Sequence, residues 1–300
     1  MRTRPPSTRL AVLLLLAALW AASGCRPKAD ASPPLATPGV TLNYQRAPLG
    51  SVLEITYRFQ VAQDAKFPEN YRVMMHVVDA DEELMWTDDH NPAVPTTQWK
   101  PGQVVEYTRT VFVPIYPYIG EASIQVGLYS LTTQKRVPLS GENVGQWAYE
   151  VARLQLLPQT ENVMIVFKDG WQPTEVADNN PNVEWQWTKK EATISFRNPK
   201  KDAILYLDLD APGGVFEQPQ AVEVRMGDQK LDSFTLQPKD QLLRKVPLTA
   251  AQLGAAEMAE LKIVVDKTFV PALVQGANSH DPRELGVRVF HAYLDARGKE

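Results

Sequence analysis

The segment VLEITYRFQV, residues 52–61, indicates the fold class of this chain. Its odd-numbered positions, from Leu53 to Val61, are all apolar, whereas most even-numbered positions are polar, including Glu54 and Arg58. Successive side chains of a β-strand point to opposite faces, so this period of two predicts a strand with one buried face.

Neighbouring segments repeat the pattern. Residues 71–80 (YRVMMHVVDA), 104–113 (VVEYTRTVFV) and 122–130 (ASIQVGLYS) alternate in the same way, and turn-rich pieces such as DDHNPAVP and KPGQ separate them. Short alternating strands between turn signals are typical of sandwiches. We therefore predict an immunoglobulin-like antiparallel β-sandwich over residues 40–156.

The second half of the chain is again rich in strands. The stretch LLPQTENVMIVF near residues 156–167 marks the crossing into it, and VRMGDQKLDSF predicts a hairpin turning at Gly227-Asp228. One short helix is expected in TAAQLGAAEMAE, with Thr249 as its cap and Gly254 as an interruption. Several strands with one small helix predict a jelly-roll-like β-sandwich over residues 157–300, so the whole chain is expected to be all-β.

The N-terminus has the pattern of an export signal. Three arginines precede an apolar run from Leu10 to Ala22, about thirteen residues, which is short of the ~20 needed to span a bilayer. Ala22-Ser23-Gly24-Cys25 follows and resembles the lipobox of bacterial lipoprotein precursors. The resemblance implies cleavage of a signal peptide of residues 1–24 and acylation of Cys25.

Two alternatives remain open: an ordinary signal peptide cleaved near Ala22-Ser23-Gly24, or a retained membrane helix. Cys25 is the only cysteine, so no internal disulfide can form, and acylation would remove a reactive thiol from an exported protein. We expect an exported protein anchored by lipid to the outer membrane or to the outer face of the inner membrane.

The Pro- and Ala-rich residues 25–39 predict a flexible tether, with folding expected to begin near Val40. Cleavage before Cys25 removes three arginines and no acidic residue, which moves the formal net charge from −4 to about −7. No basic cluster remains, so nucleic acid is not an expected partner.

Signals for catalysis are sparse. The four histidines stand in no paired metal spacing, and no GxSxG motif occurs. The most polar cluster, Asp88-Asp89-His90-Asn91, fits either a site or an ordinary loop. Asp208 and Asp210 share one strand face and are weak candidates for calcium or for hydrolysis. No other cofactor is expected.

Aromatic and arginine side chains are the stronger binding candidates. Trp185 and Trp187 lie two residues apart on one strand face, where they can either stack on a sugar ring or fill the core. Trp171 follows a turn and is expected to be more exposed. Arg283 can pair with Asp281 or bind a sugar.

Two further resemblances concern the sandwiches. The first is carried by His76-Val77-Val78-Asp79-Ala80, Asp89-His90-Asn91-Pro92, residues 95–102 and Val126-Gly127-Leu128-Tyr129. These pieces, within residues 45–150, resemble an immunoglobulin-like domain appended to bacterial membrane glycosyltransferases, whose catalytic segments are missing from this chain.

In the second half, three pieces resemble sandwich modules attached to bacterial glycan-processing proteins: Gly170-Trp171, Trp185-Gln186-Trp187-Thr188 and the segment of residues 281–286.

Three functions stay open. The favoured hypothesis is a non-catalytic envelope module that binds a glycan or an envelope protein of a surface-polysaccharide pathway. The alternative is a structural or assembly lipoprotein that makes only protein contacts. The third is a hydrolase, which would need several carboxylates converging in one cleft.

Overall fold

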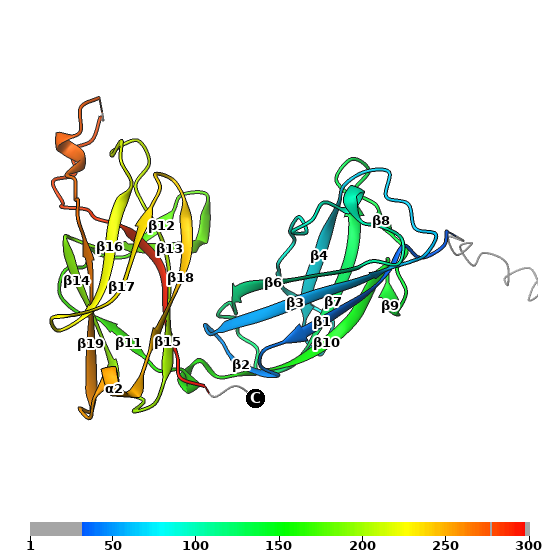
Figure 1. Ribbon diagram of the computed structural model, residues 1–300, viewed down its shortest axis with the longest axis horizontal. Helices are drawn as coiled ribbons and strands as arrows, with labels where there is room; N and C mark the ends of the chain where they lie inside the picture. Colours follow the sequence, from blue (N-terminus) through cyan, green and yellow to red (C-terminus); the bar gives the residue numbers. More distant parts are fainter. Residues whose placement is uncertain (1–31, 277, 298–300) are drawn as a thin grey trace, which may run out of the picture.

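The computed structural model describes residues 32–276 and 278–297. Figure 1 shows two bodies made almost entirely of strands. The strands form four sheets, and each half of the chain contributes two that enclose its own apolar core. The predicted all-β class with two β-sandwiches is therefore confirmed. The predicted signal peptide and Cys25 lie outside the described residues.

The first sandwich holds two sheets of unequal size. Sheet A contains, in spatial order, β1 (Ala36–Leu42), β3 (Val52–Val61) and β6 (Val104–Phe112). Sheet B contains β2 (Arg46–Pro48), β10 (Ala148–Leu157), β7 (Gly120–Ser130), β4 (Tyr71–Val78) and β5 (Leu84–Thr87), with β8 (Arg136–Val137) beside β7 and β9 (Glu142–Gly145) beside β10.

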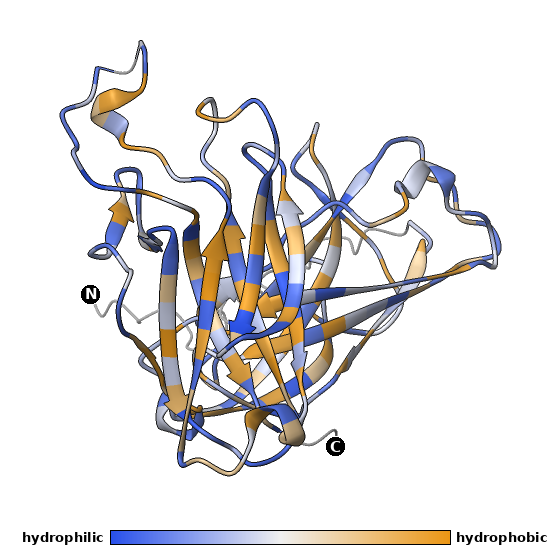
Figure 2. Ribbon diagram, turned by 60° about the vertical axis from the view of Figure 1, so that its left-hand side comes forward, coloured by the Kyte–Doolittle hydropathy of each residue, from blue (hydrophilic) through white to orange (hydrophobic). Residues whose placement is uncertain are grey.

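Alternation along the strands builds the core between these sheets. Ile55, Tyr57 and Phe59 of β3 are fully buried, whereas Arg58 is exposed. Ile124 of β7 faces them across the core. Figure 2 shows the same alternation of hydrophilic and hydrophobic residues along strands of the molecule. The period of two in the sequence therefore marks the buried face correctly.

Two details differ from the sequence-based expectation. Strand β1 begins at Ala36, which is 1% exposed and joins the core, so folding starts four residues before Val40 and shortens the predicted tether of residues 25–39. In addition, β2 runs parallel to β10, an exception to the antiparallel prediction. β1 and β2 belong to different sheets, and this change of sheet sets the direction of β2.

The second sandwich has two five-stranded sheets. Sheet C contains, in spatial order, β12 (Glu175–Ala177), β13 (Asn180–Trp187), β20 (Arg288–Asp295), β15 (Ala203–Asp210) and β18 (Gln241–Leu248). Sheet D contains β11 (Ile165–Phe167), β14 (Glu191–Arg197), β19 (Met258–Val265), β16 (Gln220–Met226) and β17 (Gln229–Leu236).

The predicted hairpin and helix are both present, and the helix stops at the interruption expected at Gly254. β16 and β17 pair across the turn at Gly227-Asp228. Helix α2 spans only Ala250–Leu253, with Thr249 and Gln252 forming a capping box. Gly254 ends the helix, and the chain then enters β19 of sheet D. There, burial of every second side chain in the core outweighs helix propensity.

The remaining helical turns are η1 (Thr96–Gln98), η2 (Gln159–Glu161) and η3 (Pro271–Leu273). Within the described ranges, no helix has the length and apolar content needed to cross a membrane.

The two sandwiches touch through a small buried cluster. Val52 of the first sandwich and Tyr206 and Tyr293 of the second are its buried members, with exposed fractions of 0%, 3% and 6%. An ion pair between Glu54 and Lys245 flanks the cluster. The outer face of sheet C is therefore covered over one part and open over another.

Candidate functional site

The open part of sheet C gathers the predicted binding residues of the second sandwich. Its register places Trp187 opposite Arg288, Arg288 opposite Asp210, and Asp210 opposite Gln241. Because paired residues on adjacent strands point to the same face, these four side chains form one row across β13, β20, β15 and β18.

Arg288 is the centre of this row. Its guanidinium lies 5.1 Å from the ring centroid of Trp185, 5.6 Å from that of Trp187 and 5.3 Å from that of Phe290. Its Nε also donates to Oδ1 of Asp210 at 2.8 Å in a two-bond pair. The aromatic rings and the carboxylate therefore hold one another in place through a single cation.

Trp185 and Phe290 are the aromatic side chains of this cluster that remain half-buried. The ring of Trp185 meets that of Phe290 edge to face, with centroids 6.0 Å apart. Its Nε1–H has no hydrogen-bond acceptor among the described residues. This nitrogen is itself buried, so a ligand would meet the accessible part of the indole ring, which the cation of Arg288 backs and which can stack on a sugar ring.

Trp187 lies on the same face, as predicted, but is only 9% exposed. Its ring contacts Phe269 edge to face at 5.8 Å, and its Nε1 donates to Glu175 Oε2 at 3.4 Å. The sequence left two roles open for these tryptophans, packing in the protein or contact with a ligand. Trp187 packs beneath Arg288, whereas the ring of Trp185 remains accessible to a ligand.

Trp171 lies apart from the Trp185 face. It is half-buried against the core of the second sandwich, contacts Phe167 at 4.6 Å, and donates from Nε1 to the carbonyl oxygen of Thr193 at 2.8 Å. Its preceding turn gave a reasonable expectation of exposure, but the structure gives this side chain packing partners and a satisfied indole.

Arg283 forms the pair with Asp281 that its sequence neighbourhood suggested, with its Nη2 2.6 Å from Oδ2. The same Nη2 lies 2.7 Å from Oε1 of Glu175, which is opposite Trp185 in the register of β12 and β13. The hydrogen bonds that Arg283 donates to Asp281 raise the pKa of Arg283. Arg283 thus lies near the β12 side of the open face, and the structure already gives its charge two partners.

Asp208 and Asp210 share the outer face of β15 but have different partners. Asp210 pairs with Arg288, while Asp208 accepts from Gln241 Nε2 at 2.8 Å and lies 3.3 Å from His291 Nδ1. Within the described residues, no group of three or more His, Cys, Asp or Glu side chains has an arrangement able to hold a metal ion.

The polar cluster of the first sandwich is turned inward. Asp88 receives two hydrogen bonds from Arg109 at 2.7 Å and one from the hydroxyl of Tyr57 at 3.1 Å. His90 lies 2.8 Å from the Tyr107 hydroxyl, and burial lowers its pKa. These contacts describe a polar network within the sandwich, in which His90 is held neutral.

His76, in the strand next to this network, is partly buried, and burial lowers its pKa as well. Its Nε2 lies 3.7 Å from Asp89 Oδ1, and that oxygen also accepts from the amide of Met75 at 3.0 Å. These contacts give His76 a structural role within the first sandwich.

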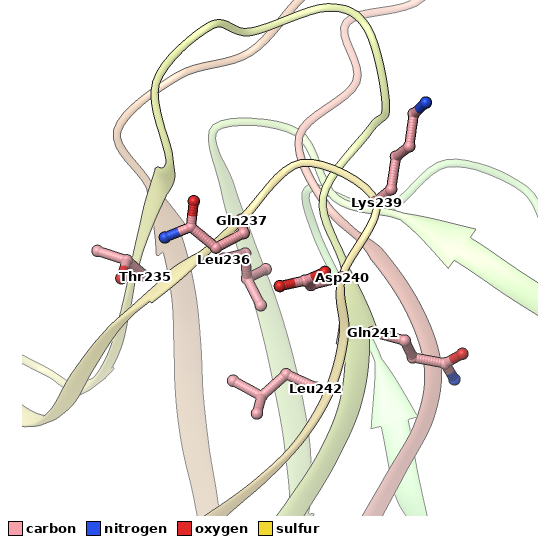
Figure 3. Close-up of a pocket in the computed structure, with 7 residues that line it drawn as sticks. All are labelled: Thr235, Leu236, Gln237, Lys239, Asp240, Gln241 and Leu242. Atoms are coloured by element: carbon pink, nitrogen blue, oxygen red, sulfur yellow. The ribbon is translucent and has the colours of Figure 1, made fainter.

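A shallow hollow lies at the β18 side of the open face, by the β17–β18 turn, and has a volume of about 280 Å³ (Figure 3). It is lined by Thr235, Leu236, Gln237, Lys239, Asp240, Gln241 and Leu242. Gln241 therefore belongs to both the row of sheet C and this hollow, which supplies polar groups but no aromatic ring.

Sequence reasoning gave little weight to three members of this face, Arg288, Phe290 and Gln241. The alternation of β20 did carry a signal, because Arg288 and Phe290 are two residues apart. Their meeting with Trp185 could not be read from the chain, since about a hundred residues separate β13 from β20 and only the register joins them.

Comparisons with known proteins identify no family. No protein-family model matches the chain, and no curated protein matches it in sequence. Similar solved structures include the CBM22 tandem domain of Paenibacillus barcinonensis Xyn10C, at 10% identity and a TM-score of 0.27, over 83% of this chain and 79% of that one.

Two others are the CBM51-2 and INT domains of Clostridium perfringens ZmpB with GlcNAc, and Bacteroides ovatus SGBP-B with a mixed-linkage heptasaccharide. Their identities are 10% and 8%, and their TM-scores are 0.27 and 0.25. The matches cover 86% and 84% of this chain but 40% and 51% of theirs. At such TM-scores the likeness carries no argument about function.

Proposed function

We propose that this chain is a non-catalytic, lipid-anchored protein of the bacterial cell envelope that binds a glycan on the open face of sheet C. The observation that carries the proposal is the half-buried Trp185, whose ring is held against Phe290 and Arg288. Sugar rings present apolar C–H faces and a rim of hydroxyls, and this group offers an aromatic face next to hydrogen-bonding side chains.

Binding is favoured over catalysis by the state of the carboxylates on this face. Asp210 is tied to Arg288, and Asp208 to Gln241 and His291. A glycosidase needs one carboxyl group free to protonate the leaving oxygen and a second beside it. Here each carboxylate already accepts hydrogen bonds from protein side chains, so neither is free to act as the general acid. This favours binding of a ligand over its hydrolysis.

The anchor supports an envelope location for this binding protein. Acyl chains on Cys25 would hold the sandwiches at a membrane surface through the residues between Cys25 and Ala36. Such a tether would let the open face reach polysaccharide above the membrane.

The test is the binding of a soluble chain that starts at Arg26 to neutral and acidic polysaccharide fractions from the cell envelope. Trp185→Ala is expected to weaken binding about thirtyfold, the loss typical of an aromatic hot spot. Trp86→Ala is the matched control, because Trp86 is also half-buried but lies on β5 of the first sandwich. Circular dichroism checks the folding of each variant.

Saturable binding that Trp185→Ala loses and Trp86→Ala keeps would support the proposal. A folded chain that binds no fraction would refute the glycan role and turn the search to the alternative, an assembly lipoprotein with protein partners. Binding that survives Trp185→Ala would keep the function but move the site elsewhere.

A further inference from the structure

The outer face of sheet C carries more aromatic side chains than its open part displays. Tyr206 of β15 and Tyr293 of β20 point outward on the same face as Asp208 and Arg288, but they are 3% and 6% exposed. Val52 of the first sandwich packs on both. The first sandwich thus covers the part of this face that carries Tyr206 and Tyr293.

Several contacts hold the first sandwich against this part of sheet C. Arg297 donates to the carbonyl oxygen of Val52 at 2.7 Å, and its guanidinium lies 3.8 Å from the ring centroid of Tyr44. Arg297 also pairs with Asp295 at 3.0 Å. Since Tyr44 and Val52 belong to the first sandwich and Asp295 to β20, one arginine ties the first sandwich to sheet C.

The contact between the first sandwich and sheet C ends beside the candidate site. Phe112, the last residue of β6, stacks on His291 with centroids 4.3 Å apart and ring planes 17° apart. His291 lies opposite Asp208 in the register and 3.3 Å from its carboxylate. The ring of Phe112 therefore lies at the boundary between the covered and the open parts of the face.

The register also fixes how far this boundary is from Trp185. Gln186 lies opposite Val289, so the next position, Trp185, falls beside Phe290 and next to His291. Asp208 is one strand further. His291, on which Phe112 stacks, is therefore on the strand next to Trp185, one strand spacing of about 5 Å away.

We infer that the glycan site is shared between the sandwiches: Trp185 forms one side, and Phe112 of the first sandwich, stacked on His291, closes the other. The inference rests on the proposed function and adds a residue of the first sandwich to its site. A sugar ring that stacks on Trp185 would also meet Phe112 beside it, and the buried Tyr206 and Tyr293 cannot extend the contact. Phe112 therefore limits the length of glycan that the face contacts.

The experiment uses the full chain in a detergent without a sugar headgroup. The probes are oligosaccharides of increasing length, made by partial hydrolysis of the polysaccharide fraction that the wild type binds. Calorimetry measures the affinity of the wild type, Phe112→Ala, Phe112→Tyr and Lys245→Ala. Lys245→Ala is the matched control, because it breaks the Glu54 ion pair at the same junction without touching the stack.

We expect the affinity of the wild type to stop rising at a short oligosaccharide length. Phe112→Ala should weaken binding about tenfold and shift that length, whereas Phe112→Tyr and Lys245→Ala should bind as the wild type does. A folded Phe112→Ala protein with wild-type affinity and length dependence, beside a defective Trp185→Ala, would overturn the shared site and leave the proposed function standing. A wild type that binds no fraction would refute both.

Discussion

Replacing Arg297 by alanine tests how firmly the two sandwiches are joined. The guanidinium contacts the ring of Tyr44 and the carbonyl oxygen of Val52 in the first sandwich, and Asp295 in the second. The substitution would leave the carboxylate of Asp295, which is only 5% exposed, without its cationic partner.

The size of the effect follows from these contacts. A hydrogen bond from a charged donor contributes about 1.5 kcal/mol, and a partly desolvated cation–π contact about 1 kcal/mol. The unpaired carboxylate adds to the loss, but the Arg297 side chain is 21% exposed, so solvent screens part of this contribution. The variant should therefore lose about 3 kcal/mol, which lowers the melting temperature of a chain of this size by about 6–12 °C.

Scanning calorimetry is the assay, with Arg153→Ala as the control. Arg153 also makes two ion pairs, but its side chain is 60% exposed, so its removal should leave the melting temperature almost unchanged. Equal melting temperatures for Arg297→Ala and the wild type would refute the reasoning, because the junction would then contribute nothing to stability.

Three further outcomes are expected. Gly170→Ala should unfold more readily than Gly214→Ala by about 3 kcal/mol in urea titrations, since both residues have positive φ but only at Gly170 would a Cβ meet a carbonyl oxygen, that of Glu191, at 1.9 Å. Equal losses would contradict this steric argument. Burial holds the pKa of His90 below its usual 6.5, so as the pH falls the unfolded chain binds a proton at this residue before the folded chain does. Stability should therefore fall as the pH drops below about 6.5, and His90→Gln should flatten this dependence; an unchanged urea midpoint between about pH 7.5 and about pH 5 in the wild type would argue against it. Cys25→Ser should abolish incorporation of labelled palmitate and release the protein from the membrane fraction, and labelling that persists would exclude Cys25 as the acylated residue.

Much of the fold could be predicted because a half-buried strand alternates apolar and polar residues in the sequence, with a period of two. The segment around Ile55 and Tyr57 shows this, since both side chains are buried as the alternation requires. Turn chemistry also acts locally, so the hairpin at Gly227-Asp228 and the cap at Thr249 were found where expected. The short helix likewise ends at Gly254, the residue that the sequence marked as its interruption.

The candidate site was only half visible in the sequence. The alternation placed Trp185 and Trp187 on one face of their strand, and Asp208 and Asp210 on one face of theirs, but it did not show that both pairs share the outer face of sheet C. Burial separates the two tryptophans through contacts from a distant loop, above all that of Phe269 with Trp187.

The sequence by itself therefore determined the all-β class and the alternating faces of the strands, because both depend on residues close together in the chain. It also carries the lipobox-like motif at Cys25. Tertiary structure alone decided that Arg288 meets Trp185 and that the first sandwich covers Tyr206 and Tyr293. Those contacts join residues far apart in the chain, and such pairings depend on strand order and register, which no local pattern encodes.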